Sequence, residues 1–396
     1  MAGKLWFLHA LGVVIRCCLV HSSLPAILKS CVEVSTPMNS WKRVVEGVFL
    51  HERGIDPYTG DIYHEMCDFA TALCLAQVAN EFAKEMMTKQ KLESHSYAKD
   101  TSPMYLFNPY VILNCLAMTT TVFSNFALAA CLLCSMRGQR LGATWFLALA
   151  TYQSFYPVTL IVPVSMYIAE VEGIRLTNYK SRAAIKSILY TSFLFVLWCI
   201  GLLILSFELM ENWNFLPSIY GFLLLAPDLA PSIGLFWYFF TEMFDHFRLF
   251  FTCTFQINAF IYLLPLAIKL KKMPMLLYFM LCCLSAVFKS YPSIGDVGFY
   301  MSLLPLFAYL SKHMRQAFLI SGIFLACSVL LPITRYLWLY AGSANSNFYF
   351  SINLAFATGQ IFLATDLLFA YLKRDFHLTN GVQITIDGEP AKIVLQ

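Results

Sequence analysis

The chain has 396 residues, of which 59% are hydrophobic and 13% charged, and its mean hydropathy is +0.65. Soluble domains contain roughly 45–50% apolar residues, so this composition excludes an ordinary soluble core and predicts an integral membrane protein. The net charge is only +4 and the basic residues form short clusters, which argues against nucleic acid as a partner.

Each bilayer crossing needs about 20 mostly apolar residues and must satisfy its own backbone hydrogen bonds. We therefore expect an all-α polytopic membrane protein with ten to twelve transmembrane or re-entrant helices. The first, residues 5–20, carries Lys4 and Arg16 and lacks a clear small-residue cleavage site, so we interpret it as an uncleaved helix.

The loop after this helix, at about residues 22–66, contains Asp56 within Asp56-Pro57-Tyr58-Thr59-Gly60. A carboxylate in this place is typical of lumenal glycosyltransferases that use lipid-linked sugars. Such enzymes need two acidic groups together, one as a base and one for a metal ion, and no adjacent acidic pair occurs here. An ordinary turn, with the Asp56 side chain capping backbone amides, is the interpretation we favour.

Charge predicts the topology of the remaining helices. The segment 141–170 would be about 45 Å long as a straight helix, but residues 152–157 interrupt it, which predicts a hairpin that returns to the same side. The positive-inside rule assigns five basic clusters to the cytosol: Arg137 with Arg140, residues 175–186, residues 269–272, Lys312 with Arg315, and Lys373 with Arg374.

Further spans are expected at 188–207, 247–268, 275–288, 297–310, 317–339 and 348–371. Residues 208–246 then stay outside or dip into the membrane, and residues 341–347 form a turn. The expected organisation is a multi-pass membrane domain over 1–375 and a cytosolic tail over 376–396. Because the same scheme places residues 227–246, 289–296 and 341–347 on the lumenal side, we expect the functional face there.

Helix breakers at residues 227–234 precede an aromatic run at 235–240, which suits a re-entrant piece near the membrane interface. Three ionisable residues follow beside apolar surface: Glu242, Asp245 and His246. Each costs free energy there unless it is paired or wetted. A lipid or headgroup pocket and simple interfacial anchoring of a helix end are both compatible with this pattern.

Two further turns carry polar side chains. Lys289 and Asp296 bracket a Pro-containing turn and predict a local ion pair. The sequence Ala-Gly-Ser-Ala-Asn-Ser-Asn at 341–347 offers neutral donors and acceptors of the kind that bind sugar hydroxyls and phosphodiesters. It is equally typical of a tight turn, since Gly, Ser and Asn are turn formers.

Known catalytic signatures are missing from the sequence. There is no HxxHH-type box, no phosphate-cradling glycine-rich loop with a lysine and no G-x-S-x-G elbow. The 13 cysteines lie mostly in apolar runs, as in Cys131-x-x-Cys134, and are interpreted as small buried hydrophobic residues. Hydrolase and di-iron functions therefore lose support, and we expect no metal ion and no cofactor.

Several blocks, in order along nearly the whole chain, resemble subunit U of the glycosylphosphatidylinositol (GPI) transamidase: residues 40–47, 148–154, 234–240, 255–258, 288–292 and 340–348. The resemblance implies a multi-pass protein of the endoplasmic reticulum membrane. Its implied fold is like that of lumenal lipid-sugar-dependent (GT-C-like) glycosyltransferases. It further implies a non-catalytic member of a five-subunit complex, in which the catalytic cysteine belongs to a caspase-like partner subunit.

The resemblance also implies site residues. The turn at 341–347 matches the family motif that contributes to the GPI site, so Asn345 and Asn347, with Ser343 beside them, are the candidates for binding the glycolipid. The block 236–251 resembles the region linked to the anchor lipid or to the C-terminal attachment signal of substrate proteins. Glu242, Asp245 and His246 are therefore weaker candidates.

Two other functions stay open at this point. The chain could be a mannosyltransferase using a dolichol-linked sugar, with Asp56 or Glu65 as base and Glu46 assisting. A lipid transporter or scramblase ranks last, because it would need charges at mid-membrane depth in facing helices. The chain also departs from the family pattern after Glu65, where the apolar run at 69–82 is too short to span comfortably and predicts at least one missing crossing.

Overall fold

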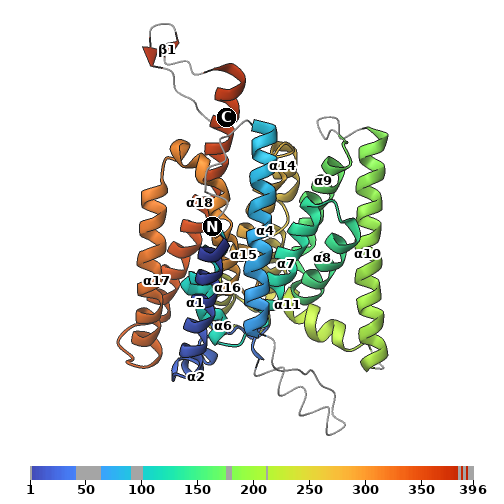
Figure 1. Ribbon diagram of the computed structural model, residues 1–396. Helices are drawn as coiled ribbons and strands as arrows, with labels where there is room; N and C mark the ends of the chain where they lie inside the picture. Colours follow the sequence, from blue (N-terminus) through green and yellow to red (C-terminus); the bar gives the residue numbers. More distant parts are fainter. Residues whose placement is uncertain are drawn as a thin grey trace. The chain divides into compact units, whose positions relative to one another are not determined.

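The computed structural model describes residues 2–41, 64–90, 101–174, 181–210, 213–381, 385–386 and 389–390. Most of these residues are helical, as the sequence predicts, and their contacts divide the chain into two compact units. The first unit covers residues 1–305 and the second covers residues 306–396 (Figure 1). Each unit is described by itself below.

Four helices in the described part of the chain are long and apolar enough to cross a membrane: Arg182–Leu209, Asp245–Lys269, Ala317–Leu339 and Ser346–Asn380. A fifth is added if Ile294–Ser302 and Leu304–His313, which are bent by 67° at a short break, form one span. The chain is therefore a multi-pass membrane protein. This number is smaller than the ten to twelve helices that we expected. The difference arises because other apolar segments form helices of only 10–17 residues.

The first unit begins with α1 (Ala2–Val20), which confirms the expected first helix, and α2 (Leu24–Lys29). The next described helix, α4 (His64–Gln90), packs against α5 (Thr101–Phe107) and α7 (Thr121–Met136) and buries Leu75, Val78 and Phe82. At 27 residues it is about 40 Å long. The apolar run at 69–82 is only part of this longer helix, but the helix is not among the candidate membrane spans. This agrees with the expectation that the run is too short to span.

A hairpin follows, with α6 (Pro109–Leu116) before α7 and with α8 (Arg140–Ser154), η2 (Tyr156–Leu160) and α9 (Ile161–Val171) after it. The chain reverses at Phe155, whose φ of 60° ends α8. An ion pair between Arg140 and Glu172 joins the start of α8 to the residue after α9, and Ser187 hydrogen-bonds both side chains. The predicted hairpin is therefore confirmed, and these contacts also attach α10 (Arg182–Met210).

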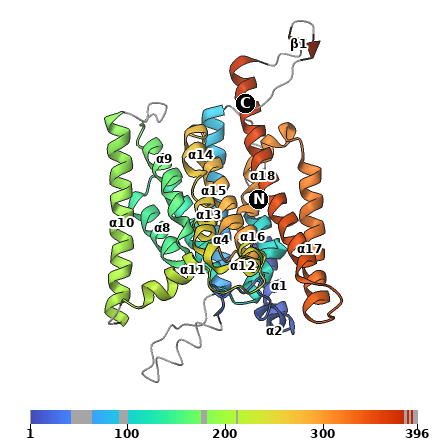
Figure 2. The ribbon, with the colours of Figure 1, turned by 180° about the vertical axis from the view of Figure 1, so that it is seen from behind.

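After α10 the chain forms short pieces, namely η4 (Pro217–Gly221), α11 (Phe222–Leu225), α12 (Phe236–Glu242), η5 (Asp245–Phe247), α13 (Arg248–Asn258) and α14 (Leu263–Lys269). Figure 2 shows the first of them running inward from the end of α10. The lack of a long helix at 213–246 agrees with the prolines and glycines there. Phe236 and Phe240 of α12 pack on Phe255 of α13, with ring centroids 5.1 and 5.6 Å away.

Two buried helices complete the first unit, α15 (Pro274–Phe288) and α16 (Ile294–Ser302). The chain then continues as η6 (Leu304–His313). Helix α16 packs closely on α6, because a Cβ added at Gly295 would lie 2.5 Å from the Asn114 side chain. Glycine at this position therefore permits the close approach of the two helices.

The second unit is a helical hairpin of α17 (Ala317–Leu339) and α18 (Ser346–Asn380), followed by the paired strands β1 (Thr385–Ile386) and β2 (Glu389–Pro390). The span predicted at 317–339 is confirmed to the residue, whereas α18 continues past residue 375, where the tail was expected to begin. Asp366 of α18 is 6% exposed and accepts the backbone N–H groups of Arg315 and Gln316 at 3.0 Å. This buried carboxylate holds the start of α17 against α18.

Candidate functional site

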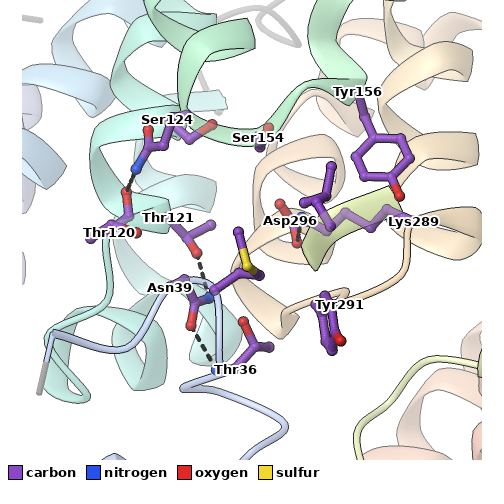
Figure 3. A pocket seen from close by; sticks show the side chains of 13 residues that line it. Thr36, Asn39, Thr120, Thr121, Ser124, Ser154, Tyr156, Lys289, Tyr291 and Asp296 are labelled. Carbon is purple, nitrogen blue, oxygen red and sulfur yellow. Dashed lines mark hydrogen bonds and ion pairs between the residues drawn. The ribbon is translucent and has the colours of Figure 1, made fainter. Parts of the chain in front are cut away.

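A polar cavity of about 40 Å³ lies in the first unit (Figure 3). A neighbouring cavity of about 30 Å³ shares five of its lining residues. A water molecule needs about 10–15 Å³ of such volume, so the two cavities have room for a few waters and not for a sugar ring. The larger cavity is lined by Thr36, Met38, Asn39, Thr120, Thr121, Ser124, Gln153, Ser154, Tyr156, Leu223, Lys289, Tyr291 and Asp296.

An ion pair forms one wall of the cavity. Lys289 follows the last residue of α15, and its Nζ lies 2.5 Å from Oδ2 of Asp296 in the first turn of α16. The side chains are 13% and 20% exposed, respectively. Asp296 also accepts the backbone N–H of Ser293 at 2.9 Å and completes a capping box. The predicted local ion pair is confirmed, and its carboxylate is engaged by two partners.

The opposite wall comes from the segment after α2 and from the start of α7. Asn39 accepts the backbone N–H of Thr36 at 2.6 Å and donates to Oγ1 of Thr121 at 2.7 Å. Thr36 is 1% exposed, and its own hydroxyl has no hydrogen-bond partner among the described residues. Figure 3 shows Asn39 and Thr36 facing the ion pair across the cavity. Sequence reasoning missed both residues, because nothing in their local pattern marks them.

Tyr156 connects several elements beside the cavity. Its hydroxyl donates to Gln256 of α13 at 2.9 Å and accepts the backbone N–H of Ser290 at 3.1 Å. Gln256 donates to the hydroxyl of Ser290 at 2.9 Å, and that hydroxyl donates to the carbonyl of Leu223 at 2.6 Å. Hydrogen bonds with every partner in place hold side chains rigidly in an apolar interior. The network therefore fixes the hairpin turn after α8 against α11, α13 and the end of α15.

The chemistry available in the cavity is hydrogen bonding from hydroxyl and amide groups next to one paired carboxylate. Within the described ranges, no group of three or more His, Cys, Asp or Glu side chains could hold a metal ion. Two carboxylates of the mannosyltransferase hypothesis, Asp56 and Glu46, lie outside the described residues. Of the third, Glu65, only the backbone is described. The arrangement can bind water or a hydroxyl group.

The three residues proposed for the glycolipid lie together in the turn between α17 and α18. Ser343, Asn345 and Asn347 are all exposed, and Gly342 before them has a φ of 63°. Asn345 caps α18, because its Oδ1 accepts the backbone N–H groups of Asn347 at 3.1 Å and Phe348 at 3.4 Å. The sequence predicted the turn but not this capping role. Exposure leaves the neutral groups of the turn accessible to a ligand.

The weaker candidates lie elsewhere, in the connection between α12 and α13. Glu242 ends α12, while Asp245 and His246 belong to η5, and all three side chains are exposed. The ring of His246 packs on Phe247 with a centroid distance of 4.0 Å. None of the three lines either polar cavity. Their role, as a lipid pocket or as interfacial anchors, stays a prediction.

Comparison with known proteins extends over almost the whole chain. The family model described as GPI transamidase subunit PIG-U matches residues 10–67 and 65–356. The GPI-anchor transamidase components PIGU of Mus musculus and Homo sapiens are 41% identical, and each alignment covers 100% of both chains. The GPI transamidase component GAB1 of Saccharomyces cerevisiae is 29% identical over 94% of this chain and 95% of its own.

The same comparisons bear on the predicted missing segment. The alignment with the Homo sapiens relative has 441 positions, whereas the chain has 396 residues, so 441 − 396 = 45 positions have no counterpart here. The family model matches in two parts that overlap at residues 65–67, where the sequence departs from the family pattern. The division of the match agrees with a shortened region after Glu65.

Proposed function

This chain belongs to the PIG-U family of GPI transamidase subunits, and from that premise we propose that it is a non-catalytic membrane subunit of a GPI transamidase that helps to recognise and position the GPI lipid anchor. The observation that carries the proposal is the family match over residues 10–67 and 65–356, together with 41% identity over full length. The proposed location is the endoplasmic reticulum membrane. Its proposed partners are the other subunits, among them a caspase-like catalytic subunit, and the C-terminal signal of substrate proteins.

The polar cavity supports positioning over bond chemistry. Asp296 is its one carboxylate, and that group is held by Lys289 and by a backbone N–H group. A general base needs a free carboxylate within reach of the proton it removes. A subunit that holds a lipid substrate beside a catalytic partner instead contributes orientation, which by itself lowers a reaction barrier.

We place the GPI headgroup at the turn over residues 343–347. Its carboxamides and hydroxyls suit sugar hydroxyls and phosphodiesters. Aromatic side chains gather around it, with Tyr336, Tyr340 and Phe348 at 61%, 70% and 60% exposure. Tyrosine and other aromatic residues concentrate at membrane interfaces, so these side chains support a position of the turn at the membrane surface. We further propose the lumenal side, ten to twelve spanning or re-entrant helices, and a GT-C-like arrangement of them.

The test uses cells that lack the endogenous subunit. We expect Asn347→Ala to lower surface display of GPI-anchored proteins, while the variant still co-purifies with the other transamidase subunits. Asn380→Ala is the matched control, because it removes an exposed asparagine at the other end of the same helix. Asp56→Asn should leave display unchanged. Severe loss with Asp56→Asn alone would overturn the proposal in favour of a mannosyltransferase.

A further inference from the structure

An apolar cavity of about 310 Å³ lies in the first unit, between α8, η2, α10 and η4. It is partly open, and nearly all of its surface is apolar. The mechanism proposed above makes no use of it. Its lining residues are Thr151, Tyr152, Phe155, Val158, Phe195, Cys199, Leu203, Leu216 and Tyr220.

The cavity borders on the lipid-facing surface of α10. Phe195, Cys199 and Leu203 are spaced four residues apart, so they share one face of the helix and form one wall of the cavity. The next residue along from each, namely Val196, Ile200 and Ile204, is 49%, 48% and 50% exposed. Because α10 is a candidate membrane span, this exposed stripe faces hydrocarbon. The cavity therefore lies beside a part of α10 that hydrocarbon can reach.

The tyrosine hydroxyls at the cavity are engaged in hydrogen bonds with neighbouring elements. The hydroxyl of Tyr152 pairs with that of Ser206 of α10 at 2.6 Å, and the hydroxyl of Tyr220 donates to the Tyr152 carbonyl at 2.8 Å. Trp145 and Trp198 form a second contact between α8 and α10, with ring centroids 4.9 Å apart. These contacts fix the distance between α8 and α10. The apolar cavity between the two helices therefore does not collapse.

The hairpin turn separates this cavity from the polar ones. Phe155 has a φ of 60°, a conformation that is strained for a side chain of this size. Its ring lines the apolar cavity and contacts Tyr220 and Phe260, with centroids 6.5 and 6.0 Å apart. Tyr156, the next residue, lines both polar cavities. The strained backbone therefore places one aromatic ring on each side.

We propose that this cavity binds one acyl chain of a bilayer phospholipid. Folded proteins contain few voids larger than a water molecule, and an apolar cavity of about 150 Å³ already binds benzene. The cavity here is larger, has an apolar lining and is walled by a helix that is a candidate membrane span, so a hydrocarbon chain is the occupant whose chemistry and access both agree with it. This proposal does not depend on the role of the chain in GPI transfer.

The test uses the complete complex in nanodiscs of phosphatidylcholine that carries a diazirine on one acyl chain and contains no GPI. After irradiation, labelled peptides are identified by mass spectrometry. We expect labelling of residues 151–158 together with Phe195, Cys199 and Leu203. Leu203→Trp fills the cavity and should reduce labelling of 151–158 at least tenfold, whereas Ile204→Trp, the same enlargement on the lipid-facing stripe, should not.

Two further variants keep the result interpretable. Thr151→Val replaces the one buried cavity hydroxyl that has no partner among the described residues, and labelling should persist because an acyl chain needs no polar contact. Cys199→Phe is a second filling variant in case Leu203→Trp does not assemble. Three results would each overturn the proposal. They are labelling confined to the exposed stripe of Val196, Ile200 and Ile204, undiminished labelling in the filled variants, or loss of labelling in Thr151→Val.

Discussion

Asn345 offers a direct test of the proposed glycolipid site, because its side chain has two ends that can be changed separately. Oδ1 accepts two backbone N–H groups at the start of α18, at 3.1 and 3.4 Å. Nδ2 forms no hydrogen bond with any residue in the described ranges, and we propose it as a donor to the GPI headgroup. Asn345→Ala removes both ends, whereas Asn345→Asp keeps the cap and removes the donor.

The two substitutions differ in expected magnitude. Loss of an N-cap side chain costs about 1 kcal/mol, so Asn345→Ala should lower the stability of the hairpin by that amount. Aspartate caps equally well, and a negative charge at a helix N-terminus adds about 0.3–1 kcal/mol of stability. A lost hydrogen bond to a charged phosphate costs about 1.5–3 kcal/mol in binding, which is roughly a tenfold loss of affinity or more.

The assay combines thermal unfolding of the purified complex with surface display of GPI-anchored proteins in cells lacking the endogenous subunit. We expect Asn345→Asp to unfold no earlier than the native protein and yet to lose most of its display. Asn345→Ala should lose both. Full display by Asn345→Asp, with reduced display by Asn345→Ala, would mean that Asn345 acts only as a helix cap, and the reasoning above would be refuted.

Three further predictions concern stability, each measured by thermal unfolding of the purified complex. Lys289→Met should destabilise the first unit by about 3 kcal/mol, because it leaves a largely buried carboxylate without its cation. Combining it with Asp296→Asn should cost less than the sum of the two single changes. Strict additivity of the two changes would argue against coupling between the residues. Asp366→Ala should destabilise the second unit by about 2–3 kcal/mol, since two backbone N–H groups lose a charged acceptor; Asp366→Asn should cost less. Gly295→Ala should cost about 1–3 kcal/mol, because the new methyl group would lie 2.5 Å from the Asn114 side chain. Gly201→Ala, with open space around it, should instead stabilise α10 by about 0.5–1 kcal/mol. Equal effects of these two changes would contradict the packing argument.

Local sequence determined several features correctly. A long apolar run between polar boundaries predicted the helix at 317–339 to the residue. The helix breakers around Pro157 predicted the reversal between α8 and α9, and the spacing of Lys289 and Asp296 around a turn predicted their ion pair. These features depend on backbone preferences and on neighbours a few residues away. Such information is contained in any short stretch of the chain.

Other features were decided by tertiary packing. The polar cavity brings Asn39, Tyr156 and Asp296 together from distant parts of the sequence, and none carries a local sign of that encounter. Tertiary structure likewise decided the length of α4, which continues as a helix on both sides of the apolar run at 69–82. The family, by contrast, was indicated by sequence motifs spread along the chain. The cavities follow only from how the helices pack, because a void is a property of surfaces that meet in space.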